Sequence, residues 1–378
     1  MAGDLTDERL AKQLKDDSTA PVPEAHTEVR DDDEEMPRVV LTRRHTIGFV
    51  LFVLAAIAFL YFVLPQISGV TDTLDRVSEG DRWWLAAALG LQVLAMGSFV
   101  AIFHGVQVPP NSGLTHRDSY LITMASLAAT RLFAAAGAGG VALTAWALRR
   151  AGMERREVAE RMIAFLVLLY GMYMLVMIVC GIGLRTGLFP GRAPFAMTVV
   201  PAIIAAVGIA IVLPLSLLPE DIDRRIEWLA PRRPRLARWL RRLASGPASL
   251  GGGVRFALRK IRRPDLAMIG VVTWWAFNIA VLWACFHAFG EPPPTAVLVQ
   301  AFFVGMLGNL LPLPGGIGGV DGGMIGALVA FGVGGHLAVL AVLSYRLFAF
   351  WLPTIPGVIA YFQLRRRVQQ WRAHPVAA

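Results

Sequence analysis

The sequence predicts an all-α integral membrane protein with about six full transmembrane helices and two re-entrant helical hairpins, arranged as an inverted repeat. Three observations predict this fold class. Of the 378 residues, 56% are hydrophobic and only 17% are charged. Several apolar runs exceed the roughly 18 residues that indicate a bilayer-spanning helix. Two further apolar stretches are broken by glycine-rich segments that resemble each other.

The chain begins with an acidic segment, residues 1–36, which holds 12 acidic and 4 basic residues. It contains no apolar run and carries DDDEE near its end. A secretory signal would be basic and then apolar. The segment is therefore expected to be a disordered cytoplasmic tail.

Six apolar segments are long enough to cross a membrane completely. They are residues 47–67, 83–104, 159–184, 196–218, 266–289 and 337–362. These spans divide the membrane part into a first repeat, 37–190, and a second repeat, 191–364. A basic cytoplasmic tail is expected at 365–378.

Two stretches, 118–148 and 295–334, fit hairpins that enter the membrane and return on the same side. The first is too short for two crossings, which need about 40 residues, and too long for one. RLFAAAGAGG (131–140) supplies its bend, and LPLPGGIGG (311–319) bends the second. The second has 40 residues, so two full crossings are the alternative there. GAGGV at 137–141 aligns with GIGGV at 316–320, and the order of span, span, hairpin and span repeats with it. Inverted repeats with broken helices are typical of transporters.

Arginine and lysine placement supports this threading, because cytoplasmic loops collect basic residues. With the N-terminus inside, the cytoplasmic segments after residue 36 hold 25 basic residues and the outer loops hold 4. Both termini are then cytoplasmic. The first hairpin enters from the inner side of the membrane and the second from the outer side.

The break GNLLPLPGGIGGVDGG (308–323) is predicted to end one half-helix and to begin another near Gly319. Non-helical backbone at membrane depth is tolerated only inside protein or beside water. Asp321 then has two interpretations. It is a carboxylate that interacts with the N–H groups of the new helix, or a buried acid that carries a proton or pairs with a cation in a transport path.

Three arginines, Arg131, Arg161 and Arg346, fall within membrane segments, where an unpaired charge costs at least about 2.5–3.5 kcal/mol. They either pair internally with Glu160 or Asp321, or line a cavity and bind phosphate through the guanidinium fork. Arg161 has the further option of extending to the inner surface. Because the cations outnumber these acids, an anionic ligand such as a lipid headgroup is expected.

The loop 219–264 carries 13 basic and 4 acidic residues. Its apolar residues recur at helical spacing in RLARWLRRLA and again at Val254, Ala257, Leu258 and Ile261. One or two helices on the inner leaflet, attracted to anionic lipids, are expected here; a plain positive-inside loop is the alternative. Nucleic acid is not an expected partner.

Sequence motifs for catalysis are missing. P-loop, HExxH, GxSxG and kinase signatures do not occur, and no metal or cofactor is expected. Cys180 and Cys285 both lie in apolar runs without CxxC spacing, so they are expected to be packed core residues. The chain is therefore not expected to be an enzyme.

GNLLPLPGGIGGVDGG and the following SYRLFAFWLP resemble the signature of the lysylphosphatidylglycerol synthase transmembrane-domain family, also called flippase-like. The resemblance covers about 47–364 without the family's C-terminal synthase domain, and Glu160–Arg161 is similar to an ER pair of the first half. Asp321 stands where glutamate is usual, and AAAGAGGVALT stands where the first bend commonly has a proline and an acid.

The resemblance implies a lipid translocase in the cytoplasmic membrane of a prokaryote, moving an anionic or aminoacylated phospholipid or a polyprenyl-phosphate lipid. Alternatives are a subunit of an enzyme that modifies lipids or lipid-linked sugars, and a non-transporting scaffold. A homo-oligomer or a complex with a lipid-synthesising enzyme is compatible with each of these functions. The candidate substrate-binding residues are Arg131, Glu160, Arg161, Asn309, Pro312, Pro314, Gly315, Gly316, Gly318, Asp321, Tyr345 and Arg346.

Overall fold

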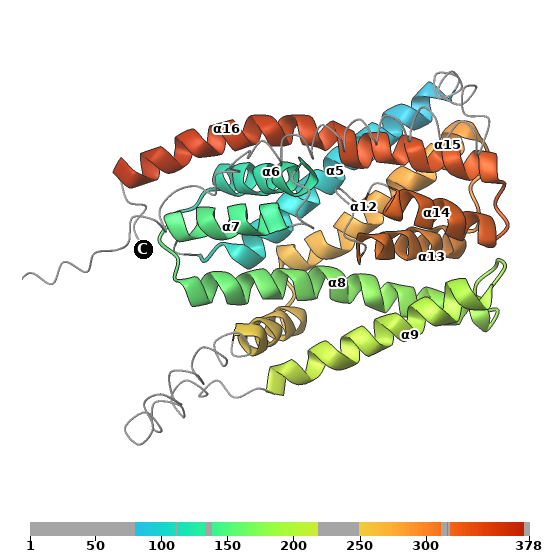
Figure 1. Cartoon of the computed structure of the whole chain (residues 1–378), viewed down its shortest axis with the longest axis horizontal. Helices are drawn as coiled ribbons and strands as arrows, with labels where there is room; N and C mark the ends of the chain where they lie inside the picture. The colour runs from blue at the N-terminus through green and yellow to red at the C-terminus, as the bar shows by residue number, and fades with distance from the viewer. Residues whose placement is uncertain are drawn as a thin grey trace, which may run out of the picture. The chain divides into compact units, whose positions relative to one another are not determined.

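The computed structural model describes residues 80–110, 112–132, 138–217, 249–310, 316 and 318–373. All of these belong to one compact unit, Val40–Ala378. Within the described ranges the regular structure is helical and no strand occurs (Figure 1). The predicted all-α fold is therefore confirmed. The predicted acidic tail and the first predicted span, 47–67, lie outside the described residues.

The helices fall into two runs in the order that the sequence predicts. The first run comprises α5 (Arg82–Gln107), α6 (His116–Leu132), α7 (Ala138–Arg150) and α8 (Arg155–Arg185). The second comprises α9 (Phe195–Val212) with the 3-10 turn η3 (Leu213–Leu217), a helix at 249–262, α12 (Leu266–Phe289), α13 (Thr295–Met306), the 3-10 turn η4 (Leu307–Leu310), α14 (Gly319–Ala330), α15 (Gly335–Arg346), the π-helical turn η6 (Leu347–Trp351) and α16 (Leu352–Ala373).

Five helical segments of the described chain are long and apolar enough to cross a membrane: Arg82–Gln107, Arg155–Arg185, Phe195–Leu217, Leu266–Phe289 and Gly335–Trp371. They confirm five of the six predicted spans. The last span differs from its prediction, because the helix does not stop at residue 362. It continues to Ala373, through most of the segment that was predicted to be a basic tail.

Several of these helices begin at residues that bind free N–H groups of the first turn. Asp81 accepts a hydrogen bond from the Trp83 N–H at 2.9 Å before α5. Asp265 accepts hydrogen bonds from the N–H groups of Ala267 and Met268 before α12. The first N–H groups of a helix have no partner within it, so these carboxylates fix where the two helices start.

Both predicted hairpins are helix–break–helix units. α6 and α7 flank 133–137, and α13 and α14 flank the segment around Gly316. The helices within each unit pack against each other. Each of the four has 17 or fewer residues, so each is shorter than the roughly 20 residues of a full crossing.

Helix–helix contacts of the first repeat have corresponding contacts in the second, as expected for a repeat. α6 packs on α7 as α13 packs on α14, and α5 packs on α8 as α12 packs on α15. Likewise α6 of the first repeat contacts α16, the last helix of the second, and α13 of the second repeat contacts α8, the last helix of the first. α5 and α12, which correspond to each other, pack together. The side of the membrane that each repeat faces stays a prediction.

The register that pairs GAGGV with GIGGV also holds at the level of single contacts. Ser126 and Thr144 share a hydrogen bond of 2.8 Å between α6 and α7. Their counterparts in that register are Gly305 and Gly323, and a Cβ on Gly323 would lie 3.4 Å from the Gly305 Cα. Positions that correspond in this register are therefore in contact in both hairpins.

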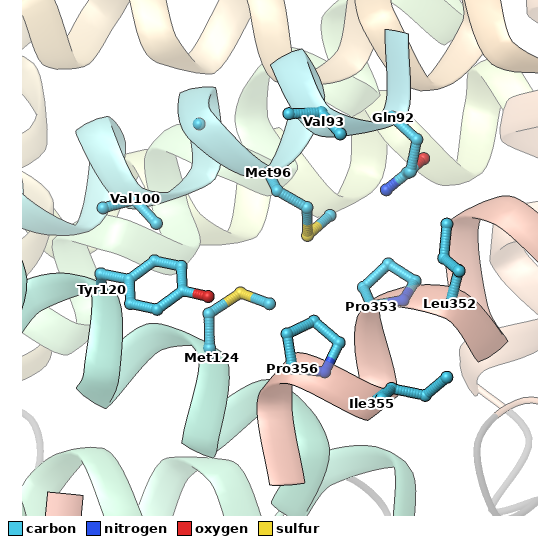
Figure 2. Close-up of a pocket in the computed structure, with 11 residues that line it drawn as sticks. Gln92, Val93, Met96, Val100, Tyr120, Met124, Leu352, Pro353, Ile355 and Pro356 are labelled. Carbon is cyan, nitrogen blue, oxygen red and sulfur yellow. The ribbon is translucent and has the colours of Figure 1, made fainter. Parts of the chain in front are cut away.

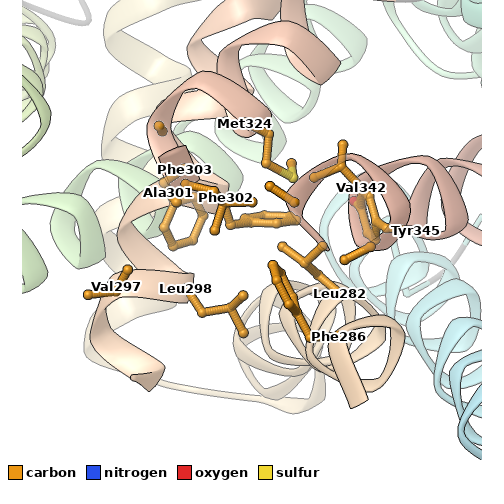
Figure 3. Close-up of a cluster of buried hydrophobic side chains, with 14 of the residues drawn as sticks. Leu282, Phe286, Val297, Leu298, Ala301, Phe302, Phe303, Met324, Val342 and Tyr345 are labelled. Atoms are coloured by element: carbon orange, nitrogen blue, oxygen red, sulfur yellow. The ribbon is translucent and has the colours of Figure 1, made fainter. Parts of the chain in front are cut away.

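A buried cluster rich in aromatic side chains lies mainly in the second repeat (Figure 3). Phe302 and Phe303 of α13 pack edge to face, with ring centres 5.4 Å apart. Phe302 also packs against Tyr345 of α15, and Phe286 of α12 is fully buried beside them. This cluster holds the second hairpin firmly against α12 and α15.

The helix at 249–262 buries part of its apolar stripe in the protein. Val254 and Ala257 are buried in the protein, and Gly253 lies against Ile163 of α8. Ile261 alone among the stripe residues is exposed. Two of the four stripe residues therefore face the protein, and binding of this loop to the inner leaflet stays a prediction. The other predicted helix of this loop, at 235–244, is outside the described residues.

Candidate functional site

The second hairpin breaks where its two half-helices approach each other closely. A Cβ on Gly308 would lie 2.3 Å from the carbonyl carbon and oxygen of Gly319, and one on Gly305 would lie 2.6 Å from the Met324 Cβ. Only glycine permits such backbone contact. The small residues of η4 and α14 thus bring the start of α14 against the end of the preceding helix.

The turn into α14 also requires glycine at two positions. Gly316 has φ +65° and Gly318 has φ +83°, values that side-chain-bearing residues rarely adopt. Asn309 lies against Gly316, because a Cβ there would meet the Asn309 Oδ1 at 2.7 Å. α14 begins at Gly319 as predicted. Pro312, Pro314 and Gly315 lie outside the described residues.

Asp321 sits in the first turn of α14 and contacts both the start of this helix and an arginine; its part in a transport path stays a prediction. Its Oδ2 accepts a hydrogen bond from the Gly318 N–H at 3.3 Å, and its Oδ1 forms an ion pair with the Arg346 Nε at 2.8 Å. Both side chains are largely buried, with exposures of 16% and 12%. Asp321 therefore both binds the helix start and compensates a buried cation, which links α14 to α15.

Arg131, at the end of α6, binds backbone carbonyl groups of the last span. Its Nη2 donates to the Ala349 carbonyl at 2.8 Å, and its Nη1 donates to the Phe350 carbonyl at 2.5 Å and to Thr354 Oγ1 at 3.3 Å. These carbonyls belong to the π-helical turn η6. Pro353 has no N–H to give to the Ala349 carbonyl four residues earlier. Arg131 supplies the missing donor.

The two arginines meet at Phe350. The Arg346 guanidinium carbon lies 4.4 Å from the centre of the Phe350 ring, and that of Arg131 lies 5.0 Å from it. The negative face of an aromatic ring attracts cations at such distances. Both cations thus contact the same ring. With Asp321, the group carries two positive charges and one negative charge inside the membrane part.

Tyr345 is buried in the core, and its hydroxyl group binds a core residue and not a member of the charged group. Its hydroxyl donates a hydrogen bond of 3.4 Å to Asn278 Oδ1, and the Asn278 amide donates to the Trp274 carbonyl. Its role is to join α15 to α12. Asn309 is more exposed and donates weakly to the Met306 sulfur at 3.7 Å.

Glu160 and Arg161 do not contact the charged group of Arg131, Arg346 and Asp321 but have other partners. Glu160 accepts from the Arg156 Nε at 2.9 Å. Arg161 pairs with Glu157 at 2.9 Å, donates to the Val106 carbonyl near the end of α5, and lies over the ring of Phe256. The two neighbours therefore do not pair with each other. Arg161 ties α8 to α5. The predicted internal pairing of this arginine with Glu160 or Asp321 is wrong, because its acidic partner is Glu157.

Sequence reasoning missed Phe350, Pro353 and Thr354, which surround Arg131 in space. A signal existed: a proline within an apolar span leaves a carbonyl without its helical donor. It also missed Asp118, which is buried and accepts from the Arg367 Nε at 2.9 Å. Asp118 joins α6 to the part of α16 that was predicted to be a tail.

The charged group is suited to binding an anion, because cations exceed acids and the N-terminus of α14 lies beside them. A guanidinium fork also matches phosphate oxygens. Among the described residues no cluster of three or more His, Cys, Asp or Glu side chains could hold a metal ion. Cys180 and Cys285 are buried, as expected for core residues.

These features define a multi-pass helical membrane protein with a broken hairpin and a buried charged group. The lysylphosphatidylglycerol synthase TM region family matches residues 46–357. The chain therefore belongs to this family, and the resemblance seen in the sequence is confirmed.

Individual relatives are membrane proteins from Methanothermobacter thermautotrophicus, each named UPF0104 membrane protein. One is 23% identical over 328 residues, which is 83% of this chain and 94% of the relative. Two others are 29% and 31% identical over 156 and 141 residues, each 37% of this chain. In these two the chain spans less than half of the relative's length, 44% and 42%. The names of these relatives state no substrate.

Proposed function

We propose that the protein is a lipid translocase that moves an anionic or aminoacylated phospholipid, or a polyprenyl-phosphate lipid, across the cytoplasmic membrane. The observation that carries this proposal is the charged group of Arg131, Arg346 and Asp321 at the break of the second hairpin. Buried ionisable groups are costly in a membrane and are retained where they bind substrates or ions. Membership of the family supports a membrane role, and the choice of lipid is part of the proposal.

The ion pair of Arg346 and Asp321 supplies a way to exchange partners during transport. An incoming lipid phosphate binds the Arg346 guanidinium and displaces the Asp321 carboxylate. Asp321 then pairs with the amine of an aminoacylated headgroup or takes up a proton. Each buried charge keeps a partner throughout, so the large cost of an unpaired charge in a medium of low dielectric constant is avoided.

Arg131 acts in this scheme as a positioning residue. Its three hydrogen bonds are all to η6 and α16, so it does not release its partners to bind phosphate. It holds the π-helical turn that follows Arg346 and adds positive potential. π-helical turns are frequent at functional sites.

Several further properties belong to this proposal. The protein acts as a carrier and not as an enzyme, in the cytoplasmic membrane of a prokaryotic cell with both termini inside. The basic loop 219–264 binds anionic lipids of the inner leaflet. A separate enzyme makes the transported lipid, either in a complex or at a distance, and self-association is compatible with the proposal.

A structural scaffold is the second candidate, and one observation favours it. Every hydrogen bond of Arg131 goes to the protein itself, and Asp321 and Arg346 satisfy each other. In that case the charged group only locks α6, α14 and α15 together. The scaffold predicts no lipid movement by the purified protein.

Transport by purified protein in liposomes separates the two candidates. The wild-type protein is reconstituted with fluorescent phosphatidylglycerol, and dithionite reports the label that reaches the outer leaflet. We expect movement faster than in empty liposomes and a loss of roughly tenfold for Arg346→Lys, because lysine keeps the charge but lacks the fork. Arg366→Ala, an exposed position on α16, should behave as the wild type.

The proposal fails if the wild-type protein moves none of three lipids: phosphatidylglycerol, an aminoacylated phosphatidylglycerol and a polyprenyl phosphate. It also fails if Arg346→Lys moves lipid at the wild-type rate while remaining folded by size-exclusion chromatography. The first result favours the scaffold, and the second removes Arg346 from the transport path.

A further inference from the structure

A cavity of about 600 Å³ lies between α5, α6 and α16 (Figure 2). Its wall is almost entirely apolar. Met96 of α5 and Met124 of α6 point into it, and Pro353 and Pro356 of α16 form the facing wall. The volume lies within the range of small-molecule binding sites.

One polar side chain points into this cavity without a partner. Gln92 is only 1% exposed, and neither its amide nitrogen nor its amide oxygen has a hydrogen-bond partner among the described residues. Figure 2 shows the amide directed toward the cavity. An unpaired buried amide costs roughly 1–3 kcal/mol in proteins. A bound molecule with a polar group would recover that cost.

The corresponding place in the second repeat is filled by side chains. In the register set by the two glycine motifs, Met96 corresponds to Trp275 and Met124 corresponds to Phe303. The rings of Trp275 and Phe303 lie 5.3 Å apart, and Tyr173 of α8 packs on both at 5.9 and 4.9 Å. Tyr173 corresponds to the start of α16, which lines the cavity in the first repeat.

The second repeat has no side-chain amide at the position that corresponds to Gln92. The counterpart of Gln92 is Val271, which is fully buried. The second repeat therefore has a dry aromatic core where the first has a cavity with an amide. A packing defect alone would not place a glutamine there, since an apolar side chain at residue 92 would avoid the cost of an unpaired amide.

We propose that this cavity binds the apolar chain of a membrane lipid, with the Gln92 amide binding the ester or other polar group at the start of that chain. Leu352 and Pro353 line the cavity and directly follow η6, whose carbonyls bind Arg131 and which directly follows Arg346. An amphiphile thus finds a cationic group and an apolar groove next to each other along one helix. That the bound lipid is also the transported one rests on the proposed function; the binding site itself does not.

Photo-crosslinking tests the site directly. Purified full-length protein in nanodiscs receives phosphatidylglycerol with a diazirine in its acyl chain, and labelled peptides are mapped by mass spectrometry. We expect labels on the α5, α6 and α16 peptides that line the cavity. The double variant Met96→Trp with Met124→Phe copies the second repeat and should reduce this labelling roughly tenfold, as expected for losing the burial of several methylene groups.

Two further variants separate lost binding from lost folding. Leu94→Trp places the same bulky side chain on an exposed face of α5 that does not line the cavity, and it should leave labelling unchanged. Gln92→Leu adds no bulk, and it should weaken labelling roughly threefold through the lost hydrogen bond. Unchanged labelling in Gln92→Leu would overturn the role of the amide.

The proposal is overturned if the wild-type cavity peptides are no more strongly labelled than exposed apolar helix faces such as that of α9. It is also overturned if a cysteine at Val93 crosslinks quantitatively to a cysteine within 47–67, because the chain's own segment then occupies the cavity. Labelled cavity peptides in a protein that moves no lipid in liposomes would retain this site and reject the proposed function.

Discussion

At the scale of single residues, the membrane arginines differ in what they bind. Arg346 pairs with a carboxylate, Arg161 pairs with Glu157 and binds the Val106 carbonyl, and Arg131 binds carbonyls of η6. All three types of partner remove the cost of a bare charge in a membrane. Only the pair of Arg346 and Asp321 joins two largely buried ions that can change partners, which is why the proposed transport step is assigned to them.

The account of Arg131 predicts a specific coupling with Pro353. Arg131→Met should lower the free energy of unfolding by about 2–3 kcal/mol, because charged hydrogen bonds to buried carbonyls are lost. Pro353→Ala returns an N–H to the Ala349 carbonyl. Arg131→Met should therefore cost about 1 kcal/mol less in the Pro353→Ala background.

This coupling is measured by denaturant unfolding in mixed micelles of the wild type, Arg131→Met, Pro353→Ala and the double variant. An equal cost of Arg131→Met in both backgrounds would contradict the compensation of Pro353 by Arg131. The Arg366→Ala variant supplies the control, because its exposed side chain should show no coupling with Pro353.

At the scale of elements, the broken hairpin depends on close backbone contact between η4 and α14. A Cβ at Gly308 would collide with the Gly319 carbonyl group at 2.3 Å. Gly308→Ala should therefore destabilise the protein by a few kcal/mol through overpacking and reduce the yield of monodisperse protein.

Gly322 on α14 provides a matched control for this prediction. No atom lies within 4 Å of a Cβ built there, so Gly322→Ala should be neutral or stabilise the helix by up to about 1 kcal/mol. The measurement is thermal unfolding followed by size-exclusion chromatography. Equal melting temperatures for Gly308→Ala and Gly322→Ala would contradict the close approach of the two half-helices.

The elements were largely predictable from the sequence, whereas the charged contacts were not. Hydropathy and length located the spans around α5, α8 and α12, because lipid excludes charge and exposed backbone from such segments. The start of α14 followed from the glycines around Gly318. Arg131 lies in the first repeat, whereas the carbonyls that it binds lie near the end of the second, and a carbonyl leaves no residue-specific mark in a sequence.

Other differences have equally local causes. The helix α16 extends past the predicted end of its span because Arg367 pairs with the buried Asp118, a contact that hydropathy cannot reveal. The pairing of Glu160 with Arg156 follows from their i, i+4 spacing on one helix face. Adjacent residues such as Glu160 and Arg161 point in different directions around a helix.

At the scale of the whole molecule, the repeat explains why the two hairpins have the same construction and different contents. The first repeat keeps a cavity where Met96 and Met124 lie, and the second fills that place with Trp275 and Phe303. The ion pair, by contrast, belongs to the second repeat alone, because Asp321 corresponds to Ala142. The cavity between α5, α6 and α16 and the ion pair between α14 and α15 therefore have no counterpart at the corresponding positions of the other repeat.

The inverted orientation that the sequence predicts for the repeats specifies the side of the membrane that two positions reach. In a background with Cys180→Ala and Cys285→Ala, a cysteine at Leu188 should react with an impermeant maleimide added to intact cells. A cysteine at Arg365 should react only after permeabilisation. Both positions are exposed. Labelling of Arg365→Cys in intact cells would contradict the cytoplasmic position of the C-terminus.

The most direct test of the central claim exchanges the two charges in Asp321→Arg with Arg346→Asp and measures lipid movement in liposomes. The exchange keeps the buried pair and the net charge, so the folded protein should persist. Our account predicts that transport falls to the level of empty liposomes, because the guanidinium is no longer on α15 beside Phe350 and the lipid path. Transport at the wild-type rate would show that the pair only locks the two helices together.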